Sequence, residues 1–483
     1  MIVFCLGSAD NFVVRVPSRP IRDTGPTVKP EPGNLPTMTD HERAAARFAA
    51  DLELDEIPEA VLDHVGLVLA DTVGAIVGGS TDDAVAALAF RLAEASTGSA
   101  SILGTHYRAA VGEAALVNGT AGTVLELDEG HKYAAGHPAI HVLPVLLAEA
   151  EVDGGSMDQL SVSFVAAYEV VTRVAEACYP LADGYHPHGV WGGIGATVAV
   201  CRYREFDADR LLTAMRIAAN NAQHTRMAAA IEGATIRNTY SGMSNLTGKR
   251  SADMAAAGFT GLENGIERHL SSATADGVDR ERLSEALGER WEVTRGYFKR
   301  HAACRYTHPT LDAIAALQAT EAIDPERVTS VVVETYPTAA SLDRTYPTNS
   351  LEAKFSVPFA VATRLVHGHS DKTAFESAAI TDRVTSLADR VEVHVADDLA
   401  ARVPDARSAR VTIRFDDGRA RSHEVEHAKG GAERPWSEAE LREKFDTLVA
   451  PVLGPETAQD LWSKLRTRST RPGRVCELAS KAG

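Results

Sequence analysis

Apolar side chains recur every three to four residues through most of residues 39–267, the spacing that buries one face of an α-helix. The segment 58–78, which opens with Pro58, shows this spacing most clearly. Further segments of the same kind, each bounded by Gly or Pro, are 82–95, 111–126, 138–151, 157–178 and 209–222. Small residues are frequent in all of them, so the pattern predicts a large all-α domain whose helices pack closely.

A second pattern begins after about residue 275. The segments that predict strands, because they are rich in β-branched residues, are 327–335, 391–395 and 409–415. Asp416-Asp417-Gly418 follows the last of them and is typical of a hairpin turn. Helical spacing returns at 309–320 and 357–366, so we predict a smaller α+β domain over residues 276–430.

The two ends of the chain differ from both patterns. The amphipathic segments 437–453 and 456–466 are expected to return to the helical domain, which then covers residues 38–275 and 431–483. Six prolines and no apolar period occupy residues 7–36, and we predict that residues 1–37 form a poorly ordered extension. Thr39 and Glu42 then have the spacing of a capping box that opens the first helix.

Charge and composition exclude several classes of protein. The 483 residues include 66 acidic and 49 basic side chains, a net charge of −17, so binding to nucleic acid or to an anionic membrane is not expected. The longest apolar run, 65–79, contains Asp71 and falls short of the ~20 residues of a membrane span. Five scattered cysteines without CxxC spacing argue against a disulfide framework or a structural zinc site and favour a cytoplasmic location.

The densest group of polar residues lies within residues 126–141, where an apolar helix gives way to a Gly-punctuated loop. It contains Asp128, His131, His137 and His141. Loops on a rigid scaffold commonly display catalytic groups. Two other interpretations remain open: a solvated helix end with surface histidines, or a metal site, although the spacing matches no known ligand set and HExxH is absent from the sequence.

A second polar group lies in the sequence GYHPHGVWGGIGAT. His186 precedes Pro187 at the expected entrance of a helix, and an imidazole on such a stiff turn suits general acid–base chemistry. The glycines match neither GxGxxG nor GxxxxGK[ST]. We therefore expect close helix packing rather than a nucleotide loop at Gly192, Gly193 and Gly195.

Basic residues form a third group in a chain that is poor in lysine: Arg237, Lys299, Arg305 and Lys354. Guanidinium and ammonium groups bind carboxylates, so these residues are candidates for a substrate-anion site. Salt bridges to the many acidic residues of the chain are the alternative. Cys304 stands among small residues, as an ordinary core thiol does.

These segments together resemble the MmgE/PrpD family, in ALVNGTAGTVLELDEGH, GHPAIHVLPVLLA, GYHPHGVWGGIGA, KRHAACRYTHPTLDA and LEAKFSVPFAVA. The resemblance extends from about residue 39 to the C-terminus. It implies a large all-α domain, discontinuous in sequence, that is capped by a smaller α+β lid domain, usually in a homodimer. It also implies an enzyme for small di- or tricarboxylates that needs neither a metal nor an organic cofactor.

The resemblance assigns positions residue by residue. Asp128 falls at the family's acidic position, His137 at its HP histidine and His186 at the histidine of its second motif. Lys299 begins a KPYPSCR-like stretch, whose further predicted substrate-binding residues are Cys304, Arg305 and His308. The chain departs from the family at Glu129, Arg300 and Ala302, and above all at Arg237, where dehydratases and decarboxylases carry a lysine. An arginine does not transfer protons at neutral pH, so this position keeps only the capacity to bind anions.

The family's activities all involve a carbon acid beside carboxylates. Our hypothesis is that the cations Arg237, Lys299 and Arg305 bind substrate carboxylates. His137 and His186 then move protons, and Asp128 orients an imidazole. We expect a lyase for a citrate-like tricarboxylate, with 2-methylcitrate dehydration first, decarboxylation of cis-aconitate to itaconate second and epimerisation of a dicarboxylate such as iminodisuccinate third. A non-catalytic, anion-binding helical protein is the alternative from another class.

Overall fold

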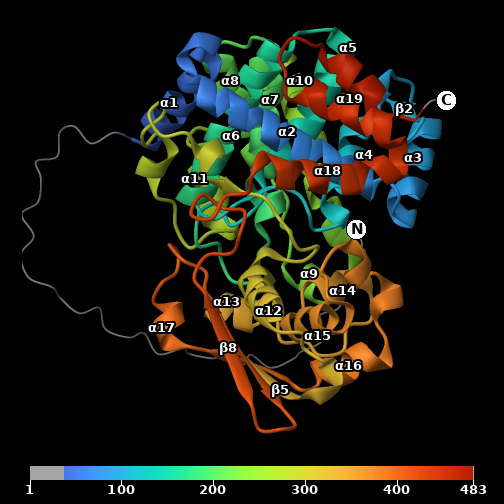
Figure 1. Ribbon diagram of the computed structural model, residues 1–483. Helices are drawn as coiled ribbons and strands as arrows, with labels where there is room; N and C mark the ends of the chain where they lie inside the picture. The colour runs from blue at the N-terminus through green and yellow to red at the C-terminus, as the bar shows by residue number, and fades with distance from the viewer. Residues whose placement is uncertain (1–36, 482–483) are drawn as a thin grey trace, which may run out of the picture. The chain divides into compact units, whose positions relative to one another are not determined.

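A large helical part and a smaller part with a mixed sheet make up the described chain (Figure 1). The computed structural model describes residues 37–481, so the predicted extension over residues 1–37 lies outside the described residues except for Thr37. The two-part architecture predicted from the hydrophobic pattern is confirmed, whereas the domain boundaries near residues 275 and 430 stay predictions.

Helices that precede or follow the mixed part are α1 (Met38–Asp51), α2 (Glu59–Gly79), α3 (Asp83–Ala95), α4 (Val111–Val124), α5 (Pro138–Asp153), α6 (Met157–Ala177), α7 (Pro187–Tyr203), α8 (Ala208–Asn220), α9 (Ala228–Ile231), α10 (Tyr240–Ala256), α11 (Gly265–Ala273), α18 (Glu438–Leu453), α19 (Pro455–Leu465) and α20 (Pro472–Leu478). Two short ribbons join them, formed by β1 (Ala100–Ser101) with β2 (Arg108–Ala109), and by β3 (Gly130–His131) with β4 (Gly296–Tyr297). The predicted helices of this part agree with these bounds to within one or two residues at each end.

The first helix begins differently from the prediction. Thr37, not Thr39, is the N-cap of α1, and its side chain forms the capping box with Asp40. The predicted box with Glu42 is wrong because that carboxylate is buried, where it accepts hydrogen bonds from Arg216 Nε (2.7 Å) and from the Ile266 main-chain nitrogen (3.0 Å). The carboxylate of Glu42 therefore stabilises tertiary contacts and does not cap the first turn of α1.

The mixed part contains the strands β5 (Val328–Thr335), β6 (Val391–Val395), β7 (Ala409–Phe415) and β8 (Ala420–Val425), and the helices α12 (His308–Thr320), α13 (Pro337–Ala340), α14 (Ser350–Lys354), α15 (Val357–His367), α16 (Asp382–Ala388) and α17 (Asp397–Ala400). The strand order is β6-β5-β7-β8, with β6 parallel to β5 and the other neighbours antiparallel. The predicted hairpin turn is confirmed: it joins β7 to β8, and Gly418 supplies the positive φ of 83°.

The longest apolar run of the sequence lies in the helical core. α2 is long and apolar enough to cross a membrane by length and composition, but 78% of its apolar window is buried within the structure. α18, drawn in red in Figure 1, packs along α2, and its Lys444 forms an ion pair of 2.6 Å with Asp71. Burial against other helices accounts for the composition of α2.

Small residues bring the helices beneath the polar loops close together. A Cβ atom added at Gly192 in α7 would lie 2.2 Å from Nδ1 of His141 in α5, and one added at Gly195 would lie 2.7 Å from Val171 in α6. The packing interpretation of these glycines is confirmed. The same contact fixes the entrance of α7 against that of α5, where the polar residues gather.

Candidate active site

The candidate site is built at helix ends and held together by a short ribbon. Glu126 and Asp128 follow α4, and His137 and His186 are the N-caps of α5 and α7. The β3–β4 pairing holds the loop after α4 against the segment that leads to Lys299. Glu126 itself has a left-handed φ of 55°, an uncommon backbone conformation for this residue type that is often found at functional sites.

Glu126 lies between two buried cations. Its Oε2 is 2.9 Å from Lys299 Nζ, and its Oε1 contacts the Arg237 guanidinium. Each of the three side chains is at most 2% exposed. Burial by itself would raise the pKa of Glu126, but the charges of Arg237 and Lys299 outweigh it and hold that pKa below its usual value. The site therefore contains an ionised carboxylate that occupies the cations predicted to bind substrate.

His137 and Asp128 form a second pair beside the first. His137 Nδ1 lies 2.6 Å from the Glu129 main-chain oxygen and 3.1 Å from Asp128 Oδ2. Two acceptors at this nitrogen place the proton on Nδ1 and leave the Nε2 lone pair free. Burial opposes ionisation of Asp128, but His137 and Lys299, whose Nζ is 3.6 Å away, hold its pKa far below the usual range. The arrangement is that of an imidazole oriented by a carboxylate.

Three more imidazoles form an edge-to-face cluster with His137, in which the His188 ring contacts the other three. The His188 ring centroid lies 4.9 Å from that of His137, 4.5 Å from that of His186 and 4.8 Å from that of His141. Burial, reinforced by nearby positive charge, lowers the pKa of His186 and of His188 well below the usual value, so both rings are neutral near pH 7. The His186 Nδ1 accepts a bond of 3.3 Å from the His188 main-chain N–H, which leaves the proton on Nε2. His186 is thus arranged as a hydrogen-bond donor rather than as a base.

Lys354 and Cys304 lie next to this cluster. Lys354 Nζ donates to the Val124 carbonyl at the end of α4 (2.8 Å), and burial lowers the pKa of this lysine to about 8. The Cys304 main-chain nitrogen donates to the Lys354 carbonyl (2.9 Å). Burial raises the pKa of the Cys304 thiol to about 11, so the thiol is protonated and serves packing rather than nucleophilic attack.

Arg305 and His308 do not join the Glu126 cluster. Both terminal nitrogens of Arg305 donate at 3.0 Å to main-chain oxygens, those of Lys429 and Ala428, and the guanidinium stacks on Tyr297 at 4.3 Å from the ring centroid. His308 Nε2 lies 3.1 Å from the Ala303 carbonyl oxygen. The predicted cation set is therefore divided: Arg237 and Lys299 converge on one carboxylate, and Arg305 faces a different pocket.

Sequence reasoning missed Glu126, Glu129 and His188 as members of the cluster, whereas it had included Lys354 among the candidate anion-binding residues. Burial raises the pKa of Glu129 to about 8, although the Tyr168 hydroxyl and the Ala139 N–H donate to its carboxyl group. A signal existed for Glu126, since it follows a largely apolar helix and stands immediately before the Leu-Asp step. Its pairing with Arg237 crosses from the end of α4 to the segment before α10, which no local pattern reveals.

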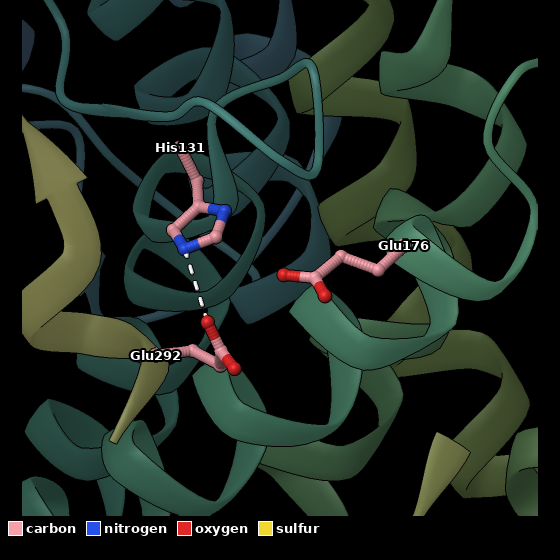
Figure 2. Close-up of side chains that lie close together, drawn as sticks. All are labelled: His131, Glu176 and Glu292. Atoms are coloured by element: carbon pink, nitrogen blue, oxygen red, sulfur yellow. Dashed lines mark ion pairs between the residues drawn. The ribbon is translucent and has the colours of Figure 1, made fainter. Parts of the chain in front are cut away.

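Figure 2 shows a separate group, in which His131 of the same loop lies near Glu176 of α6 and Glu292, which precedes β4. These described side chains are close enough to hold a metal ion. His131 Nε2 lies 3.3 Å from Glu292 Oε2. Its Nδ1 accepts from the Ala134 N–H (3.2 Å), so the proton is on Nε2, the atom that a metal would need. Glu292 is also paired with two arginines, Arg290 at 2.6 Å and Arg295 at 2.7 Å. The donor set fits ion pairing better than metal ligation.

A pocket of about 640 Å³ adjoins the imidazole cluster. Tyr185 and Pro187, which flank His186, line it together with Trp191, whose ring lies 5.0 Å from His141. Tyr306 and residues of α13 close it from the mixed part. Its volume lies within the range of small-molecule sites.

Comparison with known proteins shows what the chain is similar to. Residues 43–275 match the MmgE/PrpD N-terminal domain, and residues 301–466 match the MmgE/PrpD C-terminal domain. A cis-aconitate decarboxylase-like protein of Aspergillus oryzae is 27% identical over 462 residues, covering 88% of this chain and 93% of that protein. The cis-aconitate decarboxylase of Aspergillus terreus is 23% identical, covering 86% and 90%, and that of Homo sapiens is 24% identical, covering 72% and 74%.

Proposed function

The chain belongs to the MmgE/PrpD family, and from that premise we propose that it is a carboxy-lyase that removes CO2 from an unsaturated tricarboxylate of the cis-aconitate type. The relatives named above favour decarboxylation, the second activity expected from sequence, over 2-methylcitrate dehydration, the first. Arginine at position 237 does not separate the two activities, because the family's dehydratases and decarboxylases both carry a lysine there; it keeps only the capacity to bind a carboxylate.

The observation that carries the proposal is the juxtaposition of His137 with two buried cations. Departure of CO2 from cis-aconitate shifts an electron pair through the double bond onto the carbon beside a remaining carboxylate. Lys299 and Arg237, which meet at Glu126, are proposed to spread that negative charge, and the Arg237 Nε–H is buried without an acceptor among the described residues. One proton must then be added to the carbon.

His137 is the proposed source of that proton. Its Nε2 is free, and the ionised Asp128 stabilises the imidazolium that would deliver the proton. His186, with its proton on Nε2, is proposed to donate a hydrogen bond to a substrate carboxylate. The balance is one proton consumed and one CO2 released for each dicarboxylate product.

A substrate panel tests the proposal. The protein is incubated with cis-aconitate, 2-methylcitrate and a racemic dicarboxylate, and CO2 and the products are measured by gas analysis and NMR. We expect CO2 and itaconate from cis-aconitate, and neither from a His137→Gln preparation that excludes contaminating enzymes. Loss of water without release of CO2 would indicate a dehydratase. Inversion of the dicarboxylate without loss of water or CO2 would indicate an epimerase, and binding without turnover would indicate a non-catalytic anion-binding protein. Each of these results would overturn the proposal.

A further inference from the structure

We propose that Arg305 and Arg407 form a second anion-binding site, separate from the Glu126 cluster, that takes one carboxylate or phosphate group. The sequence analysis placed Arg305 with the substrate-binding cations, but the structure gives it another setting. It faces a small pocket that lies between the β3 loop, the segment before α12 and the loops that flank β7 and β8.

Both guanidinium groups are fixed without a carboxylate partner among residues 37–481. Arg305 donates to the Lys429 and Ala428 carbonyls, and Arg407 Nη2 donates to the Lys132 carbonyl at 2.6 Å. Each guanidinium also stacks on a tyrosine ring, Arg305 at 4.3 Å and Arg407 at 5.3 Å from the centroid. Main-chain oxygens and aromatic faces orient a guanidinium without neutralising its charge, so both groups remain able to bind an anion.

The lining of the pocket is strongly positive in a chain whose net charge is −17. Four of its side chains are cations, Lys132, Arg295, Arg305 and Arg407, and Glu433 is the one carboxylate of the lining. Arg295 is paired with Glu292 at 2.7 Å, outside the lining. Glu433 is already bound to Lys132, at 2.5 Å. Placing positive charges together in this way is unfavourable unless an anion relieves their repulsion.

The size of the pocket limits its ligand. The cavity of about 40 Å³ has room for about three water molecules, or for one carboxylate or phosphate group, and not for a whole tricarboxylate. Tyr297 adjoins both sites, since its ring lies 6.4 Å from that of His137 and carries Arg305 on its face. The anion is therefore either the remote carboxylate of a substrate or a separate small anion.

Calorimetric titration with malonate and with inorganic phosphate, at fixed ionic strength and without substrate, tests the site independently of any turnover. We expect Arg407→Gln to weaken binding of at least one of these anions by roughly tenfold or more, because a charge-assisted contact is lost. Arg410→Gln is the matched control. Arg410 is three positions further along and is paired with Asp398 and Glu424, so its loss should leave the titration unchanged.

Two results would overturn the site: no binding of either anion to the wild-type protein, or equal binding to Arg407→Gln. Should Arg407→Gln fail to fold, which thermal unfolding reveals, the same titration of Arg305→Lys decides, since lysine keeps the charge but loses the planar donors. Competition kinetics then distinguish the two sources. If phosphate competes with substrate and Arg407→Gln has a raised KM, the site takes a carboxylate of the substrate. If phosphate inhibits non-competitively, the site takes a separate anion. Both outcomes support the site.

Discussion

His131 and His137 lie on the same loop, and both face buried carboxylates, yet their ring nitrogens differ in what they can do. His131 accepts a main-chain hydrogen bond at Nδ1 and presents its Nε2 proton to Glu292, which two arginines also hold. His137 donates from Nδ1 and keeps Nε2 free. Residue type and burial do not distinguish a structural histidine from a reactive one; the nitrogen that remains available does.

The largest expected contrast between the two histidines is in catalysis. His137→Gln should lower kcat for CO2 release by about 10²–10⁴-fold, the contribution typical of a general acid or base. His131→Gln should leave kcat near the wild-type value and lower the thermal midpoint instead. If His137→Gln and His131→Gln both fold and lose kcat to the same extent, the two histidines do not differ in catalytic role.

Removing the carboxylate of the His131 group should mainly affect stability. Glu292→Gln leaves Arg290, Arg295 and the buried Arg173 without their shared partner, so the free energy of unfolding should fall by about 3 kcal/mol. Urea unfolding followed by circular dichroism measures this loss, with Glu392→Gln on exposed β6 as the control. An unchanged midpoint would show that the ion pairs are dispensable.

The carboxylate beside His137 should have a smaller, catalytic effect. Asp128→Asn removes the charge that stabilises the imidazolium, whereas the Glu129 carbonyl still fixes the Nδ1 proton. We therefore expect kcat to fall by about 10–100-fold, less than when the tautomer is also lost. Steady-state kinetics on the folded variant check this, and an unchanged kcat would contradict the role of Asp128.

The smallest expected effect concerns the pH dependence of stability. Burial and the charge of Glu292 raise the pKa of Glu176 from 4.5 to about 7, so the folded protein holds a proton that the unfolded chain releases. This contribution is fully present below about pH 4.5 and is lost as the pH rises through about 7. Thermal midpoints at pH 5 and pH 7.5 should therefore differ less in Glu176→Gln than in the wild type, by roughly 2 °C. An equal difference in both proteins would refute the shifted pKa.

Periodic burial explains why most of the fold was predictable and part of the site was not. The strands β6 and β7 coincide with the predicted segments because their alternation is local. The pairing of Glu126 with Arg237, by contrast, depends on how α4 and α10 pack. The assignment of Arg305 to the Lys299 site followed from their closeness in sequence, but the chain turns after Cys304 and directs Arg305 onto Tyr297.

The most direct test of the proton transfer proposed for His137 is the deuterium content of the product formed from cis-aconitate in heavy water. NMR should show one solvent-derived deuteron on the carbon that gains the proton and one CO2 for each product molecule. His137→Gln should yield almost no product, while His131→Gln should yield the same deuterated product as the wild type. A product without deuterium, or wild-type turnover by His137→Gln, would contradict the account.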